Sequence, residues 1–66
     1  MKIFYNGREL IVEDGSTIAG LLGRRGLNPD TVIVEYNYRL VKKEEWSSIT
    51  LQENDSIEVL RFVGGG

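Results

Sequence analysis

The group best suited to chemistry in this sequence is not a side chain. The chain closes on Gly64-Gly65-Gly66, directly after an alternating apolar stretch. We expect Gly66 to present an ionised α-carboxylate, and glycines let a backbone approach another surface closely. An extended run from Val63 to Gly66 spans roughly 13 Å, at about 3.3 Å per residue. We therefore expect Gly64 and Gly65 to thread a narrow channel in a partner enzyme, where Gly66 is modified. The open alternative is an inert, frayed end.

The side chains offer no comparable site. The sequence has no Cys and no His, which excludes a thiolate nucleophile and a thiolate zinc site and removes the commonest general base. The adjacent Glu44 and Glu45 would point in different directions on a helical turn, so they are not expected to form a paired carboxylate site. The domain is therefore expected to be a carrier or binding protein and not an enzyme, with no metal and no bound cofactor.

Composition restricts the class of protein further. Sixty-six residues with 41% hydrophobic and 27% charged side chains are typical of one small globular domain. No apolar run approaches the roughly 18 residues of a membrane span, and the first residues lack the apolar core of a signal peptide, so we expect a cytoplasmic protein. A formal charge of −2 argues against a nucleic-acid binder. The spacing Gly23-Arg24-Arg25-Gly26 is interpreted as the basic end of a helix.

The order of elements predicts an α+β fold of the β-grasp type, in which a mixed sheet wraps around one main helix. Asn6-Gly7 predicts a type I′ hairpin turn, and Ser16-Thr17 predicts a helix start. The β-branched run 31–36 predicts a strand covered on both faces, and Trp46 is expected against the core. The expected elements are strands 2–5 and 8–13, a helix over about 17–25, strands 31–36 and 38–41, a helical turn at 42–46, a short extended piece at 49–51 and a last strand over 57–63. The domain would span residues 1–63 and the glycine tail 64–66.

The last strand predicts a docking surface beside the tail. If Ile57 and Val59 face the core, Leu60 and Phe62 face the other way and form an apolar patch. Arg61 falls on the inward row but near the sheet edge, where it would reach toward solvent or a partner carboxylate. We therefore expect Leu60, Arg61 and Phe62 to dock a partner; a second packing surface, or a register shifted by one residue, is the alternative.

The chain resembles the ThiS-type sulfur carriers of thiamine biosynthesis over all 66 residues. The resemblance is carried by the β-grasp element order, by Val34-Glu35-Tyr36-Asn37, by Glu45-Trp46 and above all by Ile57-Glu58-Val59-Leu60-Arg61-Phe62-Val63-Gly64-Gly65-Gly66. Two turns depart from the family pattern. Asn37-Tyr38 stands where the family usually has Asn-Gly, and Glu53-Asn54-Asp55 where it often has Asp-Gly-Asp.

The resemblance implies a function for the tail. The Gly66 carboxylate would be adenylated with ATP by an E1-like adenylyltransferase (ThiF). Sulfur from a cysteine desulfurase would then give a thiocarboxylate, and thiazole synthase (ThiG) would take that sulfur into the thiazole ring. ATP would belong to the activating enzyme. A molybdopterin-type sulfur carrier and a ubiquitin-like interaction module with an inert tail remain the alternatives.

Overall fold

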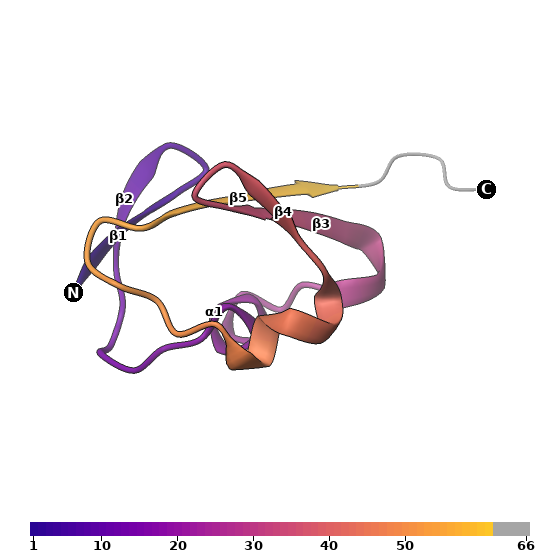
Figure 1. Cartoon of the computed structure of the whole chain (residues 1–66), viewed down its shortest axis with the longest axis horizontal. Helices are drawn as coiled ribbons and strands as arrows, with labels where there is room; N and C mark the ends of the chain where they lie inside the picture. The colour runs from indigo at the N-terminus through magenta and orange to yellow at the C-terminus, as the bar shows by residue number, and fades with distance from the viewer. Residues whose placement is uncertain (62–66) are drawn as a thin grey trace.

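The computed structural model describes residues 1–61, so residues 62–66 and the predicted boundary at residue 63 lie outside the described part. Five strands form one sheet in the order β2-β1-β5-β3-β4, and α1 packs on one side of it (Figure 1). The elements are β1 Lys2–Tyr5, β2 Arg8–Ile11, α1 Ile18–Arg24, η1 Pro29–Thr31, β3 Val32–Tyr36, β4 Arg39–Val41, η2 Lys43–Ser48 and β5 Ser56–Arg61. This mixed sheet with one main helix confirms the predicted β-grasp fold.

The opening hairpin forms as its turn residues predict. Asn6 and Gly7 take φ angles of 51° and 81°, the left-handed pair that a type I′ turn requires. Strand β2 ends at Ile11 and not at residue 13. Val12 nevertheless continues the pairing, because its N–H donates to the Met1 carbonyl at 2.9 Å and the Met1 ammonium donates to the Val12 carbonyl at 2.7 Å.

Helix α1 confirms the predicted helix within a residue at each end. The Thr17 hydroxyl accepts a hydrogen bond from the Gly20 N–H at 3.1 Å and so caps the first turn. Gly26, with φ of +70°, follows the last turn, as expected of a left-handed terminator. The helix is only seven residues long, so its stability comes from the burial of Ile18, Leu21 and Leu22 against the sheet.

The prediction that residues 31–36 are covered on both faces is wrong. Thr31 belongs to η1, and Ile33 is 36% exposed while Val32 and Val34 are buried. The physical reason is that α1 and η2 lie on one side of the sheet (Figure 1), so only alternate residues of β3 reach the core. A β-branched run is compatible with a strand that has one open face.

Strand β5 lies in the middle of the sheet, parallel to β1 and antiparallel to β3. Ile57 is fully buried and Val59 packs against the core, which confirms the predicted inward row. Trp46 is 4% exposed, as expected for its helical turn. The predicted piece 49–51 contributes one isolated bridge, between Thr50 and Thr17. The core consists of Ile3, Ile18, Leu21, Leu22, Val32, Val34, Val41, Trp46, Leu51 and Ile57.

Candidate functional site

The described part of the predicted site is the end of β5. Leu60 is 49% exposed on the outer face of the sheet, and Arg61 is exposed beside its strand partner Val32. Both positions are accessible to a partner, as docking residues must be. Phe62, Gly64, Gly65 and Gly66 lie outside the described residues, and their roles stay predictions.

Two residues that the sequence did not single out accompany Leu60. Ile33 lies directly opposite Leu60 on β3. Leu40, on β4, pairs with Glu35 and therefore faces the same side of the sheet. Their exposed fractions are 36% and 63%. Ile33, Leu40 and Leu60 together form an open apolar surface, called the docking face below. Exposed apolar side chains grouped in this way mark contact surfaces.

Negative charge interrupts the docking face. Glu35 lies directly opposite Glu58 on the same side of the sheet, and both side chains are partly buried. Like charges at directly opposed positions destabilise a sheet. Two carboxylates on neighbouring strands would attract a basic group, so the docking face suits a partner that has both apolar and basic groups.

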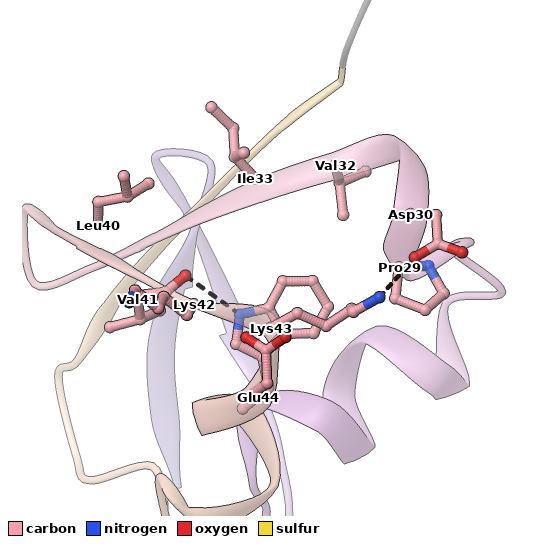
Figure 2. A pocket seen from close by; sticks show the side chains of 10 residues that line it. Pro29, Asp30, Val32, Ile33, Leu40, Val41, Lys42, Lys43 and Glu44 are labelled. Atoms are coloured by element: carbon pink, nitrogen blue, oxygen red, sulfur yellow. Dashed lines mark hydrogen bonds and ion pairs between the residues drawn. The ribbon is translucent and has the colours of Figure 1, made fainter.

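A hollow of about 390 Å³ adjoins the docking face where β4 separates from β3 (Figure 2). Ile33 and Leu40 stand at its rim, and Trp46 lies beneath, its indole N–H directed at the Val41 carbonyl at 3.4 Å. On the far side the Lys43 ammonium contacts Asp30 at 2.6 Å. Hydrogen bonding to Asp30 and its negative charge raise the pKa of Lys43. A hollow of this volume, lined in part by Val32, Ile33 and Leu40, has room for an apolar side chain of a docked protein.

Two asparagines in the hairpin turns fasten β5 to the sheet. Beyond the end of β1, the Asn6 amide oxygen accepts from the Val59 N–H at 2.7 Å, and its amide nitrogen donates to the Val59 carbonyl at 3.4 Å. Asn37 binds the other end of the strand, accepting from the Ser56 N–H at 2.8 Å. These side chains replace strand partners that the sheet lacks at those points. The strand that leads to the tail is therefore held firmly along its length.

A buried carboxylate locks the start of β5. Asp55 is 8% exposed and accepts hydrogen bonds from the Tyr36 hydroxyl at 2.7 Å, the Gln52 N–H at 2.7 Å and the Asn37 amide at 3.2 Å. Burial, followed by the hydrogen bond and negative charge of Asp55, raises the pKa of Tyr36 to about 12. The network joins the β3–β4 turn to the loop before β5. The sequence identified Asp55 only as a turn residue.

Within residues 1–61 no three His, Cys, Asp or Glu side chains gather as they would around a metal ion. None of the helices formed by residues 1–61 has the length and hydropathy of a transmembrane segment.

Comparison with known proteins gives a consistent result. A family model described as the ThiS family matches residues 1–66. A thiazole synthase of Magnetococcus marinus is 44% identical over 66 residues, which is 100% of this chain and 20% of that protein. The chain thus spans about a fifth of the length of the first curated relatives it matches. The sulfur carrier protein ThiS of Bacillus subtilis is 41% identical over 54 residues, 82% of each chain.

A solved structure agrees with this assignment. The crystal structure of the thiamine biosynthesis protein ThiS from Geobacter metallireducens covers 100% of both chains, with a TM-score of 0.86 and 28% sequence identity. The likeness extends over the whole fold, including the strand that leads toward the tail.

Proposed function

Because this chain belongs to the ThiS family, we propose that it is a sulfur carrier of thiamine biosynthesis whose reactive group is the carboxyl group of Gly66. The observation that carries the proposal is the family match, which runs through residue 66 and so includes all three tail glycines. In the working carrier Gly66 holds a free α-carboxylate. Partner enzymes recognise the folded domain, which presents that carboxylate to their active sites.

The chemistry follows from the weakness of a carboxylate as an electrophile. An E1-like adenylyltransferase (ThiF) uses ATP to convert the Gly66 carboxylate into a mixed anhydride with AMP, and pyrophosphate leaves. The terminal sulfur of a persulfide on the desulfurase then attacks the carbonyl carbon, so a C–S bond forms while the bond to AMP breaks and AMP leaves. A second thiol attacks the S–S bond of the resulting acyl disulfide and forms a disulfide with the desulfurase sulfur, which releases the sulfur that stays on the acyl group. The product is a thiocarboxylate on Gly66. ATP binds to the activating enzyme, and this chain acts as a co-substrate and not as a catalyst.

The docking face supplies recognition. Leu60 lies near the end of the last described strand, and Ile33 and Leu40 extend its apolar surface toward the hollow above Trp46. We propose that partner enzymes grip this face while Gly64 and Gly65 cross into their active sites. Thiazole synthase (ThiG) is the proposed sulfur acceptor, because a relative of that name contains a segment similar to this whole chain.

The proposal is tested by sulfur transfer in a reconstituted system. The protein is incubated with the adenylyltransferase, ATP and a desulfurase charged with isotopically labelled sulfur, and thiazole synthase is then added with its substrates. We expect the label to appear first on this protein and then in the thiazole product. A variant lacking Gly66 is the matched control, and it should acquire no label. Thiazole formation at the normal rate with that variant would refute the proposal.

A further inference from the structure

A second groove lies at the opposite edge of the sheet from β4, between the edge strand β2 and helix α1. Two hollows of about 350 Å³ and about 150 Å³ follow it, and both are lined by Leu10 and Arg25. Their floor is apolar, since Leu21 is 5% exposed and Leu10 packs against the core. Neither hollow is lined by a residue of the docking face, so the sulfur-carrier proposal makes no use of this groove.

The open edge of β2 offers backbone hydrogen bonds to a ligand. Met1 and Val12 form a hydrogen-bonded pair, because they exchange two backbone hydrogen bonds. Hydrogen-bonded and non-hydrogen-bonded pairs then alternate along the hairpin. Lys2–Ile11 and Phe4–Glu9 are then non-hydrogen-bonded pairs. The N–H and C=O groups of Glu9 and Ile11 accordingly point away from β1. Within residues 1–61 no strand lies beyond β2, so these groups are available to an added strand.

The charges along the groove favour an acidic ligand. Arg24 is held by Glu13 at 3.0 Å, and Glu9 lies 4.0 Å from Lys2. Arg8 and Arg25, by contrast, form no ion pair with any residue from 1 to 61 that the structure describes. These two guanidinium groups therefore remain available for carboxylates, which they bind through planar, paired hydrogen bonds.

One of these cations is already positioned. The Arg25 guanidinium lies over the Tyr5 ring, 4.3 Å from its centroid, a contact that restricts the long side chain before any ligand arrives. Groups ordered in advance lose less entropy on binding. The groove therefore combines an apolar floor, a positioned cation and a strand edge.

From these features we propose that the groove between β2 and α1 binds an extended acidic peptide segment of a partner protein as an added strand on the β2 edge. An apolar side chain of the segment packs on Leu10 and Leu21, and its Asp or Glu residues pair with Arg8 and Arg25. The occupant is a peptide because the edge presents alternating donors and acceptors. A nucleic acid or an anionic membrane has no peptide backbone that could pair with these donors and acceptors.

The test is a titration of the full chain with short peptides, and heteronuclear NMR monitors the binding. The probes are a panel of short synthetic peptides with Val-Ile-Val flanked on either side by Asp and Glu. Matched peptides carry Asn and Gln in place of the acids. We expect amide shifts centred on Glu9, Leu10 and Ile11, and about tenfold weaker binding of the neutral peptides. Shifts centred on the docking face, or equal affinity for neutral peptides, would overturn the proposal, as would a panel without a binder.

Variants separate the cations from the strand edge. The double variant Arg8→Gln/Arg25→Gln should weaken acidic-peptide binding about tenfold, whereas Arg39→Gln/Lys42→Gln removes two charges elsewhere and should leave it unchanged. Ile11→Pro removes one outward N–H, which an edge strand tolerates, and should also weaken binding. Thermal unfolding confirms that each variant is folded. Tighter binding of an oligonucleotide or of phosphatidylserine vesicles at the same amides would show that the occupant is not a peptide.

Discussion

The Asn6 side chain replaces a strand partner of Val59 beyond the end of β1. Its amide group forms hydrogen bonds with both the N–H and the carbonyl of Val59. Replacement of Asn6 by Gly keeps a residue that accepts the positive φ of 51° but removes both hydrogen bonds. We expect Asn6→Gly to lower the free energy of unfolding by about 1–2 kcal/mol, measured by urea denaturation. An unchanged midpoint would mean that water replaces the amide without loss.

The same variant tests whether this bond matters for function. If the hydrogen bonds from Asn6 to Val59 help to position the strand that precedes the tail, sulfur loading of Gly66 should be slower in Asn6→Gly than in the wild type. The rates are compared at a temperature where the variant is fully folded. Normal loading would restrict the role of Asn6 to stability.

Tyr36 makes stability depend on pH in the alkaline range. Its pKa is raised from 10.0 to about 12 in the folded protein, so the folded state retains the phenolic proton longer than the unfolded chain does. The stabilisation is complete below pH 10 and is lost as the pH rises from 10 through 12. Tyr36→Phe should destabilise the protein by about 1 kcal/mol at neutral pH, because Asp55 loses a hydrogen bond.

The distinguishing measurement is urea denaturation across pH 9 to 12 for both proteins. The wild type should lose stability more steeply above pH 10 than Tyr36→Phe does, since the variant lacks the titrating group. Parallel profiles would contradict the raised pKa of Tyr36, because Tyr5 and Tyr38 are present in both proteins.

Within residues 1–61, Tyr38 in the β3–β4 turn is the one residue other than Asn and Gly that has a positive φ. Tyr38 has a φ of 69° and its side chain is 81% exposed, although bulky residues rarely adopt this conformation. Tyr38 thus has left-handed backbone geometry at the position where members of the family usually have Gly. Tyr38→Gly should therefore raise the free energy of unfolding by about 1 kcal/mol.

The opening hairpin provides the matched control. Gly7 has a φ of 81°, and a Cβ added there would meet no atom within 4 Å, so Gly7→Tyr should destabilise the protein by a similar amount through backbone strain alone. A Tyr38→Gly variant that is less stable than the wild type would show that the exposed ring makes contacts that outweigh the strain.

Local signals predicted the elements well. The Asn6-Gly7 turn, the Thr17 cap and the Gly26 terminator each depend on neighbouring residues, and each was predictable from sequence. The exposure of Ile33 was not, because the run Thr31-Val32-Ile33-Val34 gives no clear sign of which face is open. Strand β3 acquires an open face only through the position of helices distant in the sequence.

In the candidate site, too, some residues were predictable from the local sequence and others depended on distant contacts. Leu60 and Arg61 were predicted from the period of the last strand, and both are accessible in the structure. Ile33 joins Leu60 through strand pairing between residues far apart in the sequence, which no local pattern contains. The outward position of Leu40 could have been found by counting back from an inward Val41. The Asn6 bond to Val59 spans 53 positions and required the structure.

For the whole molecule, recognition and chemistry are assigned to different parts of the chain, and they should separate by mutation. Leu60→Ser removes an exposed apolar side chain, so the free energy of unfolding should change by no more than about 0.5 kcal/mol. Binding to the activating enzyme and to thiazole synthase should nevertheless weaken about tenfold, as measured by calorimetry. Gln52→Ser, at an exposed loop position outside the docking face, is the control. A large loss of stability in Leu60→Ser would place this residue in the core and not on the docking face.

The most direct test of the central claim is the mass of the protein after incubation with its activating enzyme, ATP and a sulfur donor. Intact-mass analysis followed by fragmentation should show one oxygen replaced by sulfur, located on the C-terminal fragment that contains Gly66. No such change should occur without ATP. An unmodified Gly66 in an assay that thiolates a known carrier, or sulfur located elsewhere in the chain, would contradict the account.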